Sequence, residues 1–118
     1  MKKLISWVEI PAADFKRAVQ FYSRILNLDF QVVEGGDEKM ALFPGGEGAI
    51  SFAPDFNPSR DGVLVSLNAG SDLNAVLKLV EENGGEIARP KTKIEAGGMG
   101  YFALFIDSEG NKLGLYEA

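Results

Sequence analysis

Few side chains in this sequence could do chemistry, and two reactive residue types are missing. The 118 residues include no histidine and no cysteine. Without histidine the chain lacks the commonest metal ligand and the commonest general base at neutral pH. Mechanisms that need a serine–histidine or cysteine–histidine pair are therefore excluded. The lack of cysteine also excludes disulfides, a thiol nucleophile and a thiolate metal site.

The carboxylate that we consider as a general base is Glu9, which lies within an apolar, β-prone stretch over residues 4–10. Alternation along a strand places Ile5, Trp7 and Glu9 on one face. Partly buried in a cavity, Glu9 could act as a general base; the alternative is a solvated carboxylate or one paired with a Lys or Arg. Trp7 is either a stacking platform for a planar ligand or a core or dimer-interface residue.

The elements that would position these residues follow from apolar periodicity and turn residues. One helix begins at Asp14 and ends at Asn27, and a second begins at Ser71 or Asp72 and ends at Asn83. Alternating or β-rich runs predict strands over residues 4–10, 28–33, 39–43, 49–53, 63–68, 86–88, 101–106 and 112–116. Residues 89–100 are predicted to form a long loop, and its glycine-rich end, Gly97-Gly98-Met99-Gly100, is either a lid or a plain connector.

This order, one strand, one helix and three strands, occurs twice. We predict an α+β fold of two βαβββ modules in tandem, within a single domain: module one at about 1–54, a linker at about 54–62 and module two at about 63–118. A helix can cover only one face of each sheet. The uncovered faces should form an open trough with the helices on the outside, and a site would lie there.

The last two strands flank the turn Asp107-Ser108-Glu109-Gly110-Asn111. Gly110 and Asn111 are residue types that adopt the positive φ of a tight hairpin. The turn therefore predicts a closing hairpin for module two.

The two ends of the chain carry motifs: Val8-Glu9-Ile10-Pro11…Asp14-Phe15-Lys16-Arg17-Ala18…Phe21-Tyr22, and Gly100-Tyr101-Phe102-Ala103-Leu104-Phe105…Asp107-Ser108-Glu109-Gly110-Asn111-Lys112-Leu113-Gly114-Leu115. With them the chain resembles the vicinal-oxygen-chelate superfamily, which includes glyoxalase I, bleomycin-resistance proteins and extradiol dioxygenases. It is most similar to small bacterial proteins described as predicted enzymes related to lactoylglutathione lyase. The resemblance implies paired βαβββ modules and, usually, a homodimer.

Catalytic members of that superfamily bind a divalent metal through His and Glu or Gln side chains. The resemblance places these donors at Trp7, at Leu64 or Val65, near Ser51, and at Gly114. None of these residues can hold a metal, which needs three or four donors in a fixed geometry. We therefore expect no metal and no cofactor.

The same comparison, combined with alternation, gives a predicted ligand-binding face. If Leu64 stands where a metal ligand would lie in the superfamily, Ser66 and Asn68 face the trough while Val63, Val65 and Leu67 pack under the helix. Tyr116 shares its strand face with Lys112 and Gly114. Gly114 could make room for a ligand or for Trp7. The predicted cavity lining is Trp7, Glu9, Ser51, Phe52, Ser66, Asn68 and Tyr116.

Charge and hydropathy exclude several partners. The formal net charge is −5 and no Lys/Arg cluster appears, so nucleic-acid binding is not expected. No apolar run approaches the ~18 residues that span a membrane, and Glu9 interrupts the apolar start that a signal peptide would need. We expect a cytoplasmic protein.

Three functions are compatible with this sequence. The first is a metal-free protein that binds a small apolar or aromatic molecule in the trough, as bleomycin-resistance proteins do. The second is a lyase or isomerase of the lactoylglutathione-lyase type, metal-independent and with Glu9 as base. The third is a partner or regulatory subunit without a ligand.

Overall fold

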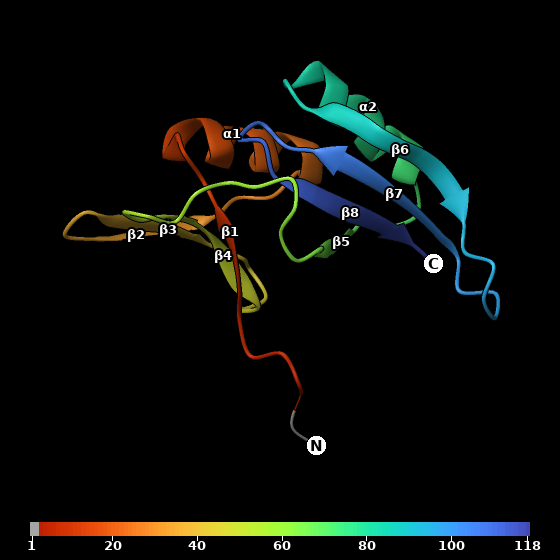
Figure 1. Cartoon of the computed structure of the whole chain (residues 1–118), viewed down its shortest axis with the longest axis horizontal. Helices are drawn as coiled ribbons and strands as arrows, with labels where there is room; N and C mark the ends of the chain where they lie inside the picture. Colours follow the sequence, from red (N-terminus) through yellow and green to blue (C-terminus); the bar gives the residue numbers. More distant parts are fainter. Residues whose placement is uncertain (1–2) are drawn as a thin grey trace.

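The computed structural model describes residues 3–118, and within them the βαβββ order occurs twice (Figure 1). The start of the predicted first module, residues 1–2, lies outside this range. Module one contains β1 (Val8–Pro11), α1 (Phe15–Leu26), β2 (Gln31–Gly35), β3 (Glu38–Leu42) and β4 (Gly48–Phe52). Module two contains β5 (Ser66–Asn68), α2 (Leu73–Glu82), β6 (Glu86–Lys93), β7 (Tyr101–Ile106) and β8 (Lys112–Glu117).

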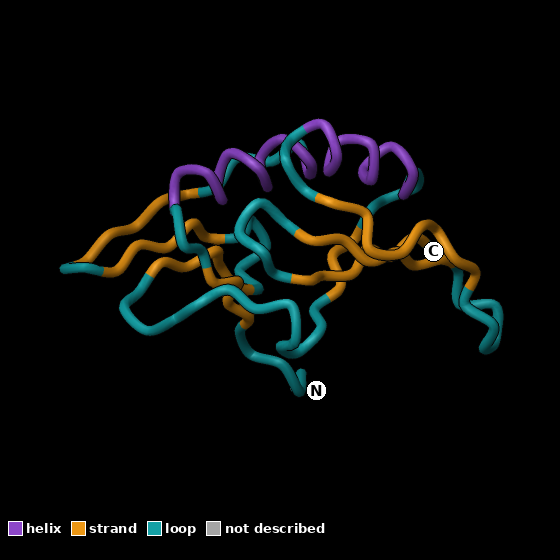
Figure 2. Tube along the Cα trace, turned by 45° about the horizontal axis from the view of Figure 1, so that its top comes forward, coloured by secondary structure: helices purple, strands orange, loops and turns teal. Residues whose placement is uncertain are grey.

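Each module forms its own four-stranded sheet, with strand orders β1-β4-β3-β2 and β5-β8-β7-β6. In both sheets the first strand pairs with the last in parallel, and the remaining pairs are antiparallel. Both helices lie on the same side of the two sheets (Figure 2). The predicted α+β fold of tandem βαβββ modules, with its helices outside, is confirmed. Neither helix of the described range is long and apolar enough to cross a membrane.

The helices begin and end where local chemistry predicts. The Asp14 side chain accepts a hydrogen bond from the N–H of Arg17 at 3.1 Å, and Asn27 ends α1 in the left-handed region with φ 53°. At α2, Asp72 caps the first turn, and Gly84 follows the helix with φ 95°. The residues they bury are Ala18, Phe21, Tyr22 and Ile25 in α1, and Leu73, Leu77 and Val80 in α2.

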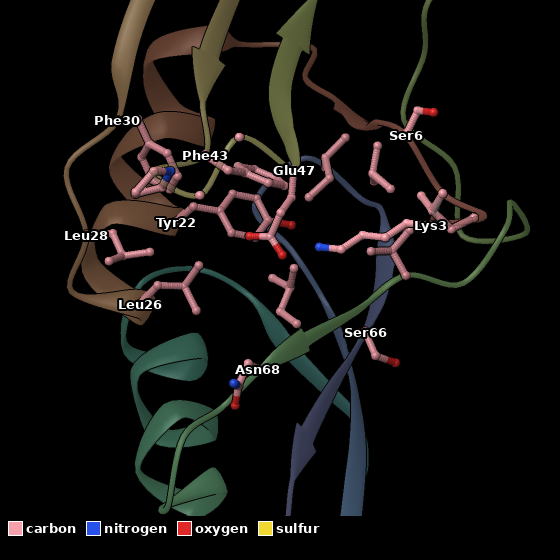
Figure 3. Close-up of a pocket in the computed structure, with 18 of the residues that line it drawn as sticks. Lys3, Ser6, Tyr22, Leu26, Leu28, Phe30, Phe43, Glu47, Ser66 and Asn68 are labelled. Atoms are coloured by element: carbon pink, nitrogen blue, oxygen red, sulfur yellow. The ribbon is translucent and has the colours of Figure 1, made fainter. Parts of the chain in front are cut away.

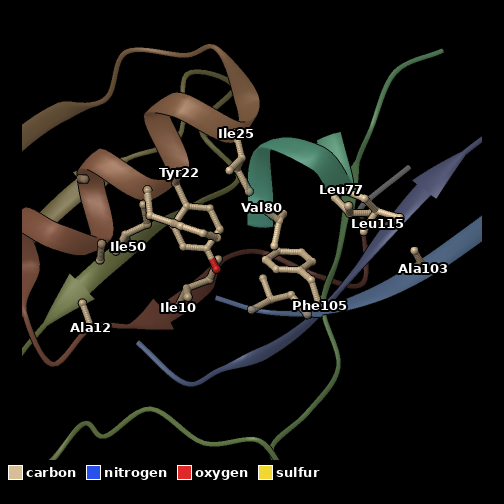
Figure 4. Close-up of a cluster of buried hydrophobic side chains, with 14 of the residues drawn as sticks. Ile10, Ala12, Tyr22, Ile25, Ile50, Leu77, Val80, Ala103, Phe105 and Leu115 are labelled. Carbon is tan, nitrogen blue, oxygen red and sulfur yellow. The ribbon is translucent and has the colours of Figure 1, made fainter. Parts of the chain in front are cut away.

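The hydrophobic core draws side chains from both modules (Figure 4). Phe21 of α1 packs edge-to-face on Tyr22, with ring centroids 5.1 Å apart, and lies 6.3 Å from the ring of Phe105 on β7. Edge-to-face aromatic pairs stabilise by about 0.5–1.5 kcal/mol beyond the area they bury. The seam between the modules is therefore packed near the helices.

The turn between β7 and β8, residues 107–111, holds the two modules together; we call it the closing hairpin. The side chain of Glu109 is fully buried. Its carboxylate accepts hydrogen bonds from the backbone N–H groups of Ala13 at 2.9 Å and Asp14 at 2.6 Å. It also accepts from the Arg17 guanidinium at 2.7 and 3.2 Å. A side chain of module two thus satisfies unpaired N–H groups at the start of α1 in module one.

Two more residues of the closing hairpin reach module one. The Tyr22 hydroxyl donates to Asp107 at 2.5 Å, inside the core. Asn111 donates to the Pro11 carbonyl at 2.8 Å and accepts from the Ser59 N–H of the linker at 3.0 Å. Gly110 has the predicted positive φ of 97°, but Asn111 does not, so the prediction for Asn111 was wrong. Asn111 is held in place by the hydrogen bonds of its side chain to Pro11 and Ser59.

Several predicted strand boundaries differ from the structure; the second strand, for example, begins at Gln31 and not at residue 28. The first strand begins at Val8, not at residue 4, because Val8 pairs with Gly48, the first residue of β4, and residues 4–7 have no neighbouring strand. The fifth strand begins at Ser66, where pairing with Gly114 of β8 begins, and Val63, predicted to pack under a helix, is 92% exposed. The predicted loop over residues 89–100 begins as strand, because β6 continues to Lys93 with a shifted register around Arg89.

The closing hairpin should make stability depend on acid pH. Burial alone would raise the pKa of Glu109, but hydrogen bonds from Arg17, the Asp14 N–H and Ser108 outweigh it, and the pKa is lowered from 4.5. A carboxyl group whose pKa is lower when folded stabilises the fold above its unfolded pKa and loses that contribution as the pH falls. The wild-type protein should therefore be more stable to unfolding than Glu109→Gln near neutral pH. This difference in free energy of unfolding should shrink below about pH 4.5.

Urea unfolding at a series of pH values measures this difference. The matched control is Glu34→Gln, an exposed glutamate that lies 4.0 Å from Lys39, for which little difference is expected at any pH. A stability difference between wild type and Glu109→Gln that stays constant into the acid range would contradict the prediction.

Candidate functional site

A cleft of about 780 Å³ lies at the seam between the modules (Figure 3). We call it the main cleft. Its walls come from the N-terminal segment and β1, the end of α1, the β3–β4 turn, and β5. It is lined by Lys3, Ile5, Ser6, Val8, Ile10, Tyr22, Leu26, Leu28, Phe30, Phe43, Pro44, Gly45, Gly46, Glu47, Val65, Ser66, Leu67, Asn68 and Gly70. Most of these side chains are apolar.

The apolar wall of the main cleft is built where α1 ends. Asn27 turns the chain in the left-handed region, and Leu26 and Leu28 on either side of it both line the cleft. Phe30 precedes β2 and Phe43 follows β3, and their ring centroids lie 6.2 Å apart at 55°. The arrangement offers aromatic and aliphatic surface to a planar or branched apolar group.

Two charged groups enter this cleft from opposite sides. Glu47, on the β3–β4 turn, directs its carboxylate inward, and Lys3 of the N-terminal segment points its ammonium toward it (Figure 3). The backbone of Glu47 is fixed, because its carbonyl accepts a hydrogen bond from the N–H of Val8 at 3.1 Å. A mainly apolar cleft with a few placed polar groups is the usual form of a small-molecule site.

A smaller pocket of about 370 Å³ lies between β1, the start of β8 and the linker. It contains Glu9 and Lys112, with Phe56 and Val63 of the linker among its apolar residues. The Ser51 hydroxyl donates to the Glu9 carboxylate at 2.6 Å, and Ser51 itself is 2% exposed. A buried serine therefore fixes one oxygen of Glu9, and the other can face the pocket.

The structure does not bring the seven predicted site residues together. Ser66 and Asn68 line the main cleft, whereas Glu9 lines the smaller pocket, supported by Ser51. Within residues 3–118, neither lining includes the other three, which are Trp7, Phe52 and Tyr116.

Those three have other surroundings. Trp7 is 42% exposed. Phe52 ends β4 opposite Lys39 of β3. The Tyr116 hydroxyl donates to the Met99 carbonyl, so Tyr116 tethers the glycine-containing loop before β7.

The reasoning from sequence missed Leu28, Phe30, Phe43 and Glu47. Leu28, Phe30 and Phe43 fall within the predicted strands 28–33 and 39–43, but in the structure all four residues lie in turns or just outside strands. The one available hint was Glu47, a single charge enclosed by glycines in the turn Pro44-Gly45-Gly46-Glu47-Gly48.

The positions that the resemblance assigns to metal donors do not suit a metal ion. Gly114 lacks a side chain, and a Cβ built there would lie 2.4 Å from the hydroxyl of Ser66, its neighbour on β5. Trp7 offers only an N–H donor, and the Ser51 hydroxyl is bonded to Glu9. Among residues 3–118, no three His, Cys, Asp or Glu side chains gather closely enough to hold an ion. We derive no chemical step through a metal.

Comparison with known proteins identifies the family. The model of the "Glyoxalase/Bleomycin resistance protein/Dioxygenase superfamily" matches residues 4–115. A "Glyoxylase-like domain-containing protein" of Didymella fabae is 33% identical over 116 residues, which cover 91% of this chain and 88% of that protein.

Solved structures share the fold at low identity. A glyoxylase/bleomycin resistance protein/dioxygenase domain from Frankia sp. EAN1pec superposes with a TM-score of 0.75 at 18% identity, covering 100% of this chain and 99% of that one. A glyoxalase/bleomycin resistance protein from Albidiferax ferrireducens T118 gives 0.72 at 20%, covering 98% and 99%. The fosfomycin resistance protein FosX of Listeria monocytogenes gives 0.69 at 16%, covering 100% and 95%.

The contact between Gly114 and Ser66 gives a test of why glycine stands at this position. Gly114→Ala should cost about 1–3 kcal/mol of stability, because its Cβ crowds the Ser66 hydroxyl. Ser66→Ala removes that hydroxyl, so the double variant should recover about 0.5–1 kcal/mol of the loss. Chemical unfolding of the four proteins measures the coupling.

Gly48→Ala serves as the contrasting control. A Cβ there would lie 2.0 Å from the backbone oxygen of Val8, which cannot rotate away, so a loss of about 3 kcal/mol or more is expected. Purely additive effects of Gly114→Ala and Ser66→Ala would show that Ser66 is not what excludes a side chain at Gly114.

Proposed function

The chain belongs to the Glyoxalase/Bleomycin resistance protein/Dioxygenase superfamily, and we propose that within it the protein binds a small apolar or aromatic molecule in the main cleft, without a divalent metal. The observation that carries this proposal is the cleft itself. Its volume of about 780 Å³ lies within the range of ligand pockets. Its walls are aliphatic and aromatic, as in sites that hold a ligand by burying it.

A small set of polar groups supports ligand binding over simple core packing. Ser66 and Asn68 lie on one wall and Glu47 on the other (Figure 3). The Asn68 side chain is already engaged, because it accepts from the Gly70 N–H at 2.8 Å. The Ser66 hydroxyl lies where a Cβ at Gly114 of β8 would stand, so Glu47 is the polar side chain that we expect to meet a ligand.

We also propose that the protein acts in the cytoplasm as a homodimer. The support is a set of exposed apolar side chains on the two segments that precede β1 and β5. Their exposed fractions are 96% for Leu4, 62% for Ile5, 42% for Trp7, 92% for Val63 and 51% for Leu64. Apolar surface of this kind often marks a protein interface. Sedimentation equilibrium should give twice the mass of one chain, and a monomer mass at micromolar concentration would refute the dimer.

The ligand-binding proposal predicts a specific loss in Phe43→Ala. A thermal-shift screen of small aromatic and polycyclic compounds should raise the melting temperature of wild type, since a ligand that binds only the folded state stabilises it by RT ln(1 + [L]/Kd). Phe43→Ala should weaken the hits by about tenfold, because a cleft wall is removed.

Phe56→Ala is the matched control for this screen, since Phe56 lines only the smaller pocket. It should leave the hits unchanged. An empty screen with a diverse library would overturn the proposal and favour a partner subunit without a ligand.

The alternative is a lyase or isomerase with Glu9 as base, and the Glu9–Ser51 contact at the smaller pocket is the observation in its favour. The assay is turnover of the hemithioacetal of methylglyoxal and glutathione, with Glu9→Gln as the test variant. Turnover that depends on Glu9 would favour this alternative, and no turnover would exclude it for that substrate.

A further inference from the structure

We infer that the ligand of the main cleft is an organic cation, an aromatic or branched apolar group that carries a protonated amine, and that Glu47 binds the amine. The inference rests on the proposed function and narrows its ligand class. It follows from where the Glu47 carboxylate is held, from what surrounds it and from the charge of the whole chain.

The β3–β4 turn places Glu47, an exposed residue, along the lining of the cleft. At Gly45, an added Cβ would lie 2.7 Å from Oε1 of Glu47, so the carboxylate occupies the space that a side chain at 45 would fill. The glycine at 48 lets the turn press against β1, where a Cβ would meet the Val8 oxygen at 2.0 Å. The hydrogen bond between the Val8 N–H and the Glu47 carbonyl fixes the backbone between these glycines.

The surroundings of this carboxylate favour a cation with an apolar body. Phe43 and the ring of Tyr22 lie beside Glu47 in the cleft, and Phe30 stands behind Phe43 (Figure 3). Aromatic faces attract ammonium groups, and Glu47, which is an exposed residue, adds a negative charge beside them. One carboxylate beside aromatic rings is thus complementary to an amine on a hydrophobic scaffold.

The chain itself shows that an ammonium can enter this cleft. Lys3 extends across the cleft with its ammonium directed at Glu47 (Figure 3). In the part of the chain that the structure describes, the two groups do not form an ion pair within 4.0 Å. The amine of a ligand can therefore take the place of the Lys3 ammonium beside Glu47. The formal net charge of −5 raises the local concentration of cations and disfavours anions.

Three isosteric probes test the inference: naphthylmethylamine, naphthylmethanol and naphthoate, measured by isothermal titration calorimetry. Wild type should bind the amine about tenfold more tightly than the neutral alcohol, a ratio equal to about 1.4 kcal/mol. It should bind the anionic naphthoate more weakly than the alcohol. The preference for the amine should fall as salt is added.

Glu47→Gln should abolish the preference for the amine and leave the affinity for the alcohol within about twofold, since the apolar walls are unchanged. Gly45→Ala, which keeps the carboxylate but displaces it, should also lower the ratio of amine to alcohol affinity. Lys3→Gln, which removes the competing ammonium, should raise it. The control Glu34→Gln removes an equal charge on exposed β2 and should leave the ratio unchanged.

The outcomes separate this inference from the proposed function. Equal affinities of wild type for amine and alcohol, or a ratio that survives Glu47→Gln, would overturn the cation inference and leave the small-molecule site standing. If Glu34→Gln lowers the ratio of amine to alcohol affinity as much as Glu47→Gln does, the preference comes from net charge, and the cation inference is overturned as well. Failure of all three probes to bind overturns the inference, and with an empty aromatic screen it overturns the proposed function as well.

Discussion

The buried carboxylate of Glu109 is the interaction on which the arrangement of the two modules depends. It comes from the closing hairpin of module two, yet it accepts hydrogen bonds from the N–H groups of Ala13 and Asp14, just before α1 in module one, and from the guanidinium of Arg17. Breaking a charge-assisted contact of this kind leaves several donors unsatisfied at once, which costs more than one neutral hydrogen bond. The start of α1 is thus held in place by a strand turn that lies about 95 residues away in sequence.

The second helix begins in a similar way. The Glu117 carboxylate at the end of β8 accepts from the N–H of Leu73 at 2.7 Å and pairs with Lys91 at 3.0 Å. The Leu73 N–H and the Lys91 ammonium both lower the pKa of Glu117. Module two therefore supplies a carboxylate to the N-terminus of each helix. The main cleft is lined by residues of both β1 and β5.

The local features of the fold were predictable from the sequence, whereas the cleft was not. Asp14, Asn27 and Asp72 delimit helices through contacts within one turn, so their residue types are sufficient evidence. The start of β1 depends on where β4 begins, which is a contact between distant segments. Likewise, nothing local shows that Glu109 reaches α1. Glu47 lines the cleft from a turn, where no periodic pattern exists to reveal it, and Phe43 follows the end of β3.

The same contrast explains the predicted site. The residues chosen from sequence follow the sheet faces where family relatives would hold a metal, and Gly114 there leaves space only for the Ser66 side chain. The cavity that this chain does offer lies at the seam, with aromatic walls from α1 and the strand ends. The concave sheet faces and the seam are different surfaces of one fold, and the fold alone does not decide which one binds a ligand.

The most direct test of this account is a crystal structure of the protein soaked with the tightest compound from the aromatic screen. The account predicts density for the compound in the main cleft, against Phe30 and Phe43 and with its polar group toward Glu47. Density for the compound or for a metal ion between Trp7 and Gly114, with the main cleft empty, would contradict it.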